Sequence, residues 1–149
     1  METDATKFNS AAPFNNHARI QTLDAAAGNG ATRIGDLPEL KNHFGTVHGG
    51  ALYTVGEVAA ARAVLSALGE HIAHLHAVTR SARIRYLKAA RGAIDARATL
   101  SPGLVQEALA AVEQQGHAEV TVEVALTDAQ GIVVATMVVD WHIGRPRTA

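Results

Sequence analysis

Residues 49–68 constrain the fold more than any other part of the chain, because they predict a long helix that is apolar on nearly every side. Alanine, valine and leucine fill this segment, and Gly69 supplies a stop. A helix of this kind must be buried on all its faces. Its many alanines would let other backbones approach closely, as a sheet wrapped around the helix would do.

The rest of the chain predicts strands. Two short extended pieces, residues 17–24 and 30–37, flank a turn at residues 27–30 and predict a hairpin. After the helix come four long extended stretches, at residues 76–88, 92–101, 117–127 and 132–143, with a short helix over residues 103–115. We therefore expect an α+β fold, with an antiparallel sheet of about six strands covering one long central helix.

Two of these stretches also predict where they lie in the sheet. Between Glu119 and Leu126, apolar residues at every second position alternate with Glu119, Thr121 and Glu123, which predicts one buried face and one wet face. Residues 132–141 are apolar on both faces for most of their length and should lie inside the sheet or beneath a partner. For domain organisation, we expect an N-terminal segment over residues 1–16, frayed or holding a short helix near Pro13. A single domain should follow over residues 17–149.

Composition excludes several classes of function. The 149 residues carry 13 Lys and Arg against 14 Asp and Glu, so no net positive charge draws the chain to nucleic acid or to an anionic membrane. The absence of cysteine excludes disulfides and thiolate chemistry. The start of the chain has no basic and apolar signal pattern, and no run reaches the roughly 18 uninterrupted apolar residues of a membrane span. We expect a soluble, cytoplasmic protein.

Glu57 is the one acidic residue in the predicted helix. An ionised carboxylate that leaves water without a partner costs several kcal/mol, so a carboxylate in an apolar helix indicates a function. The alternative is a carboxylate that reaches solvent, or that pairs with Arg62 or with a basic residue on the next strand. Nine residues earlier, His48-Gly49-Gly50 opens the helix, where free backbone N–H groups and the positive end of the helix dipole gather.

These residues resemble a known family. Asn42, the run from Gly45 to Ala51, the acid at position 57 and the Tyr86–Gly92 turn together resemble the hotdog-fold acyl-CoA thioesterases, in the branch related to phenylacetate degradation. The likeness covers about residues 17–143. It implies hydrolysis of an acyl-CoA thioester, with coenzyme A as part of the substrate and no other cofactor. It also implies a homodimer, or a dimer of dimers as a homotetramer, with each site built between two chains.

The resemblance also implies roles for individual residues. The Gly49 N–H, or the neighbouring Gly50 N–H, and the Asn42 side chain of one chain would hold the thioester oxygen. Glu57 of the other chain would activate water or attack directly, where the branch most similar to this chain has Asp. Thr79 would steer the water, with Ser81 expected on the same strand face. His48 is either part of this site or a local cap of the helix.

Three further groups of residues have more than one possible role. Tyr53 and Phe44 are expected in the core or in a pocket wall. Lys88 and Arg91 belong to a basic cluster that includes Arg83 and Arg85; this cluster is either a solvated sheet face or the contact for coenzyme A phosphates. His71, His74 and His76 have spacings that could gather a metal ion, but no Asp or Cys completes a set, so we expect a surface loop and no metal.

Two other functions fit the same pattern. One is hydration or dehydration of enoyl thioesters, although the related dehydratases carry a Pro-Gly entry and a longer separation between His and Glu. The other is non-catalytic binding of acyl-CoA by the same fold.

Overall fold

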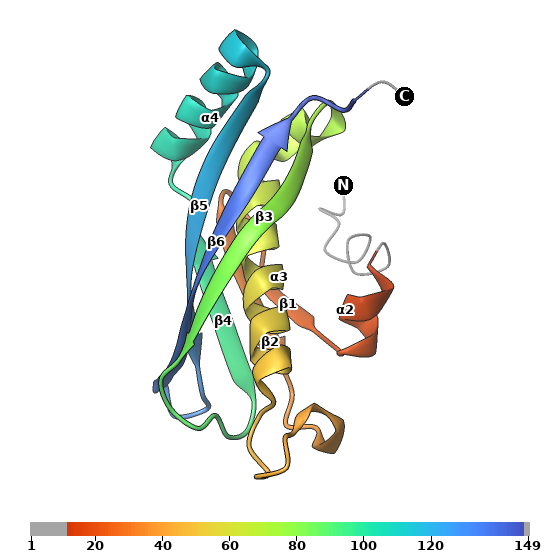
Figure 1. The fold of residues 1–149 in the computed structure, drawn as a ribbon, viewed down its shortest axis with the longest axis vertical. Helices are drawn as coiled ribbons and strands as arrows, with labels where there is room; N and C mark the ends of the chain where they lie inside the picture. The colour runs from red at the N-terminus through yellow and green to blue at the C-terminus, as the bar shows by residue number, and fades with distance from the viewer. Residues whose placement is uncertain (1–11, 148–149) are drawn as a thin grey trace.

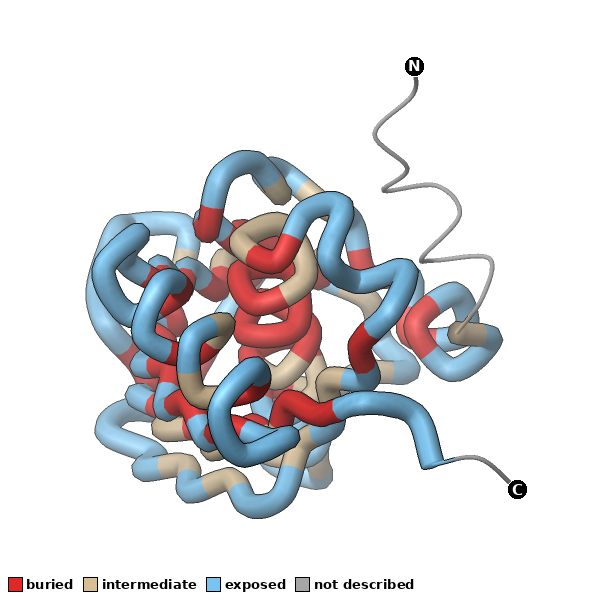
Figure 2. Tube along the Cα trace, turned by 90° about the horizontal axis from the view of Figure 1, so that it is seen from above, coloured by how far each residue is buried: buried red, intermediate tan, exposed pale blue. Residues whose placement is uncertain are grey.

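A computed structural model describes residues 12–147, and its centre is the predicted helix. Helix α3 covers Gly49–Leu68 and is continued by the 3-10 turn η2, Gly69–Ala73. By length and composition alone, Gly49–Ala73 could cross a membrane. In this fold the segment is the core helix, with the sheet curving around it (Figures 1 and 2).

Six antiparallel strands form the sheet in the order β1-β2-β4-β5-β6-β3. Their bounds are β1 Gln21–Asp24, β2 Asn29–Ile34, β3 His76–Tyr86, β4 Ile94–Thr99, β5 His117–Thr127 and β6 Val133–Gly144. Three short elements complete the chain: α2 Pro13–His17, the 3-10 turn η1 Pro38–Leu40, and α4 Pro102–Gln115. One long helix wrapped by a six-stranded antiparallel sheet confirms the predicted α+β hotdog architecture.

The sequence patterns placed most elements within a few residues, and the differences cluster at the N-terminus. The predicted first strand begins at Gln21 instead of residue 17, because His17 closes α2. The predicted domain boundary after residue 16 therefore falls inside α2, and residues 1–11 lie outside the described part of the chain. The predicted hairpin is present, with β1 antiparallel to β2. Its turn falls slightly earlier than expected, because β2 already begins at Asn29.

The two strand-level predictions are confirmed. Along β5 the side chains alternate strictly between exposed and buried up to Leu126, and the buried ones face α3 and α4. Strand β6 pairs with β5 on one side and β3 on the other, so its apolar run lies inside the sheet.

Close packing of helix against sheet depends on small residues. Ala59, Ala60 and Ala63 are fully buried. Gly30 on β2 faces this helix surface, and a Cβ atom added at Gly30 would overlap the carbonyl oxygen of Ala59. The alanines and this glycine together allow the helix backbone to lie directly against β2.

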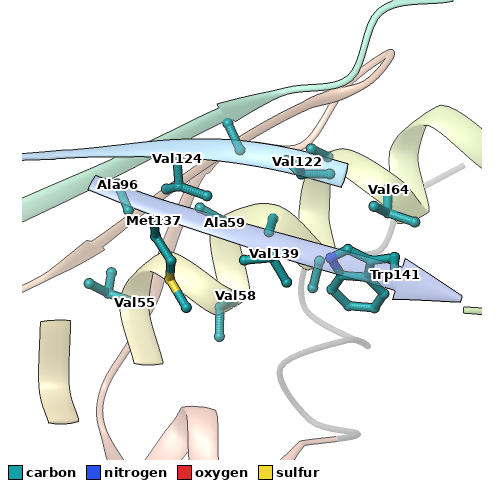
Figure 3. Close-up of a cluster of buried hydrophobic side chains, with 14 of the residues drawn as sticks. Val55, Val58, Ala59, Val64, Ala96, Val122, Val124, Met137, Val139 and Trp141 are labelled. Atoms are coloured by element: carbon teal, nitrogen blue, oxygen red, sulfur yellow. The ribbon is translucent and has the colours of Figure 1, made fainter. Parts of the chain in front are cut away.

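Larger side chains fill the remaining space between α3 and the strands β5 and β6. Val55 and Val58 of the helix lie beside Met137 of β6, and Val139 and Trp141 continue the same face (Figure 3). Each fully buried aliphatic side chain contributes roughly 1.5–3 kcal/mol through removal of its surface from water. This core fixes the position of β6, and so of its neighbour β3, relative to the helix.

Candidate functional site

The N-terminus of α3 presents one unoccupied backbone donor. His48 is the N-cap, and its Nδ1 accepts the Gly50 N–H at 2.8 Å. Among the described residues no acceptor takes the Gly49 N–H. The sequence left Gly49 and Gly50 as alternative donors, and the ring of His48 distinguishes them. His48 itself occupies the local capping position.

Tyr86 holds the same end of the helix from the sheet. Its hydroxyl donates to the Gly49 carbonyl oxygen at 3.0 Å. A Cβ atom at residue 49 would stand 3.0 Å from that hydroxyl oxygen, so glycine suits this position. Tyr86 was not among the predicted site residues, although it opens the Tyr86–Gly92 turn named above. Its inward position in the alternation of β3 was the available signal.

Asn42 shapes the turn before the helix. Its Oδ1 accepts the N–H of Phe44 at 3.0 Å and that of Thr46 at 3.2 Å, and its Nδ2 donates to the Thr46 hydroxyl at 2.9 Å. These bonds are those of an Asx turn. Within one chain, the contacts of Asn42 are therefore those of a turn residue, and Thr46 is a partner that the sequence did not reveal.

A cavity of about 410 Å³ joins these groups. Asn42 and Gly49 line it together with Tyr86 and Lys88. A second cavity, of about 260 Å³, shares Lys88 and adds Arg91 and Asp128. The structure thus brings Asn42, Gly49 and Lys88 to one hollow, with Arg91 beside it.

Glu57 lies in the middle of α3 and is only partly exposed. The Thr79 hydroxyl on β3 donates to Glu57 Oε1 at 3.0 Å. Burial raises the pKa of Glu57 above its ordinary value, and the bond from Thr79 offsets part of that rise. Trp141 pairs with Thr79 across the strands and is almost completely buried, so the pair lies beside an apolar wall.

A β-bulge decides which residues of β3 reach Glu57. Thr79 pairs with Trp141 and Ser81 with the next residue, Asp140, so Arg80 is an extra residue in the strand. The prediction that Ser81 shares a face with Thr79 is therefore wrong. Ser81 lies on the outer face and donates to Asp140 Oδ2 at 2.6 Å. With Thr121, it holds the pKa of Asp140 below its usual range.

Beyond the bulge, the side chains of β3 alternate regularly between the two faces of the sheet. Arg83 and Arg85 are exposed on the outer side, whereas Ala82 and Ile84 pack toward the core. The core alternative is wrong for both aromatic residues considered earlier. Phe44 is 75% exposed at the tip of the turn, and Tyr53 is 37% exposed on the surface of α3.

Gly49 and Glu57 do not form one site within a chain. Eight helical residues separate them, which is about 12 Å along the axis at 1.5 Å per residue. A thioester carbonyl bound at the Gly49 amide would therefore lie beyond the reach of a water held by Glu57 of the same chain. Strand β3, which carries Thr79, is an edge strand of the sheet.

The sequence matches a family model over residues 5–143, nearly its whole length. The chain belongs to the family described as a domain of unknown function, DUF4442. The name of this family states no activity, and no curated protein matches the chain.

Solved structures of other proteins share the fold of this DUF4442 member. A Pseudomonas aeruginosa protein of unknown function, titled "Probable Thioesterase", is 22% identical, with a TM-score of 0.85 over 93% of this chain and 91% of its own. The E. coli PaaI protein of the phenylacetic acid degradation operon is 15% identical, with a TM-score of 0.70 over 96% and 91%. At these identities the likeness establishes the hotdog fold, in agreement with the predicted resemblance.

Proposed function

We propose that this protein hydrolyses acyl-CoA thioesters. The observation that carries the proposal is Glu57, a partly buried carboxylate. Burial raises its pKa, and the Thr79 hydroxyl donates a hydrogen bond to it. A carboxylate in this state can accept a proton from water near neutral pH, and the hydroxyl can orient that water. Neighbours named for thioesterase activity on the same fold support the same reaction class.

The second requirement is a donor for the negative charge that develops on the thioester oxygen. The unoccupied Gly49 N–H, at the positive end of a 20-residue helix, has this property. Asn42 borders the same cavity, and its amide carries a second hydrogen besides the one given to Thr46. We assign the oxyanion contact to Gly49, with Asn42 beside it.

The base, Glu57, and the oxyanion donor, the Gly49 N–H, can meet only if two chains combine. Strand β3 is an 11-residue strand at the edge of the sheet. The backbone groups along its free edge can pair with another strand. Pairing of β3 with its copy around a two-fold axis would bring Glu57 and Thr79 of one chain toward Gly49 of the other. The proposed active species is therefore a homodimer, with two identical sites.

The nucleotide part of coenzyme A is assigned to the two cavities that share Lys88. Phosphates favour Arg and Lys, and Arg91 lies in the second cavity. The pantetheine chain would then run along the cavity that contains Gly49 and Tyr86.

Removal of both cations is expected to raise the KM for acyl-CoA. In Lys88→Ala/Arg91→Ala the KM should rise about a hundredfold or more, because charge-assisted hydrogen bonds to phosphate contribute roughly 1.5–3 kcal/mol each, while kcat should change little. The measurement is steady-state thiol release from acyl-CoA and from the matching acyl-N-acetylcysteamine, which lacks phosphates. The variant should handle the short thioester like the parent.

Arg97→Ala is the matched control, since Arg97 is an exposed cation on β4 that pairs with Asp95 and lines neither cavity. Equal rises in KM for both thioesters would contradict the assignment of Lys88 and Arg91 to phosphates.

The reaction class is tested by a thiol-release screen over short, medium, long and aryl acyl-CoAs. We expect release of free coenzyme A and free acid, from a species that sediments as a dimer or larger. Enoyl-CoA should be tested in parallel, by loss of its conjugated absorbance. Hydration without thiol release would assign the protein to the hydratases. Tight binding of acyl-CoA with no turnover of any member of the panel would indicate a binding protein.

A further inference from the structure

The sheet carries a second group of chemically active side chains on its outer face, away from α3. His117 and Glu119 are two residues apart on β5, so both side chains leave the sheet on this exposed side. His142 on β6 pairs directly with Glu119. Two neighbouring strands in fixed register thus place two imidazoles and one carboxylate next to each other.

The three side chains already approach one another closely. One potential ligand atom from each, a ring nitrogen or a carboxylate oxygen, lies within 4.8 Å of the others. His142 Nδ1 is 2.7 Å from Glu119 Oε1, and the rings of His117 and His142 are nearly parallel with centroids 5.7 Å apart. Ligand atoms about 2.0–2.1 Å from a tetrahedral zinc ion stand roughly 3.3 Å apart, a spacing that rotation of these side chains can reach without movement of the strands.

Gly144 lies beside both histidines. It pairs with His117 across the strands. A Cβ atom at Gly144 would stand 3.2 Å from His142 Nε2, so the ring of His142 lies over this glycine. On the far side of Gly144, His76 of β3 occupies the paired position in the same row.

We propose that His117, Glu119 and His142 bind a divalent transition-metal ion of the zinc class. Imidazole nitrogen together with a carboxylate is a ligand set that suits Zn²⁺, Ni²⁺ or Cu²⁺, whereas Mg²⁺ and Ca²⁺ require mostly oxygen ligands. The ion would connect β5 to β6 on the face opposite to Thr79 and Glu57. Its role would be to stabilise the sheet, and the inference does not depend on the proposed thioesterase activity.

The test uses tag-free, metal-stripped protein and titration calorimetry with ZnCl₂, with Co²⁺ absorption as a second readout. We expect one ion per chain and a rise in Tm of about 5–10 °C at a hundredfold excess over Kd, with no response to MgCl₂. His142→Ala and His117→Ala should each weaken binding on the order of a hundredfold, and the d-d bands of Co²⁺ should lose intensity. Their Tm without metal should match that of the parent.

His71→Ala/His74→Ala is the matched control, because it removes two other exposed histidines near Glu113. This variant should bind zinc like the parent. Two results would overturn the proposal: no stoichiometric binding by the parent, or binding that survives loss of both His117 and His142.

Discussion

Glu57→Gln is expected to lower the rate of thiol release from acyl-CoA by about 10²–10⁴-fold, the usual contribution of a general base. Glutamine keeps the shape of the side chain and can still meet the Thr79 hydroxyl, but it cannot accept a proton from water. The measurement is kcat/KM with the best acyl-CoA found in the screen, beside sedimentation of the variant to verify that the assembly is intact. An active Glu57→Gln dimer would remove Glu57 from the proposed mechanism.

The same variant should be more stable than the parent at neutral pH. Burial raises the pKa of Glu57 in the folded state above its ordinary value near 4.5. A group shifted in this direction contributes its stability below the unfolded pKa and loses it as the pH rises through the folded pKa. The Tm of Glu57→Gln should therefore exceed that of the parent at pH 7, and the difference should shrink on acidification. A less stable variant at pH 7 would contradict the buried state of this carboxylate.

Thr79→Val and Thr79→Ser are the companion variants for the position beside Glu57. The Thr79 hydroxyl lowers the Glu57 pKa, so its loss in Thr79→Val should move the acid limb of the pH–rate profile to higher pH. Thr79→Ser keeps the hydroxyl and should restore the limb of the parent. A purely structural role for Thr79 would change Tm but leave the limb in place.

The largest expected loss of stability comes from Gly30→Ala. The added methyl group would overlap the Ala59 carbonyl oxygen and crowd the Ala63 amide, which are backbone atoms of the buried helix and cannot turn aside as a flexible side chain would. We expect the free energy of unfolding to fall by at least about 3 kcal/mol, the upper range for overpacked cores. Thermal unfolding should show this as a Tm lower by roughly 6–12 °C.

Gly103→Ala is the matched control, because a Cβ atom there meets nothing within 4 Å and the residue lies in the first turn of α4. Alanine favours a helix over glycine by roughly 0.5–1 kcal/mol, so this variant should be as stable as the parent or slightly more stable. If Gly30→Ala melted like Gly103→Ala, the close contact between α3 and β2 would be incorrect.

Sequence reasoning succeeded where a pattern extends over many residues. The apolar character of residues 49–68 predicted a buried helix, and the alternation around Val122 predicted a strand with one wet face. Both predictions depend on sums over many side chains, and no single contact can reverse them. The position of Glu57 in that helix followed directly.

The remaining features depend on single atoms or on pairing between strands. No residue type marks the bulge at Arg80, so the face of Thr79 could not be derived from alternation alone. The choice between the amides of Gly49 and Gly50 rests on the ring of His48. The group of His117, Glu119 and His142 was missed because its members come together only through the register of β5 with β6.

The bulge also bears on how the length of this chain can vary. Because Thr79 and Ser81 pair with consecutive residues of β6, deletion of Arg80 would make β3 regular and leave both neighbours on their present faces. Thr79 would still meet Glu57, and Ser81 would still meet Asp140. An insertion or deletion elsewhere in β3 would instead exchange the two faces of everything on one side of it. Arg80 is thus the position in this strand where the chain can lose one residue without rearranging the site.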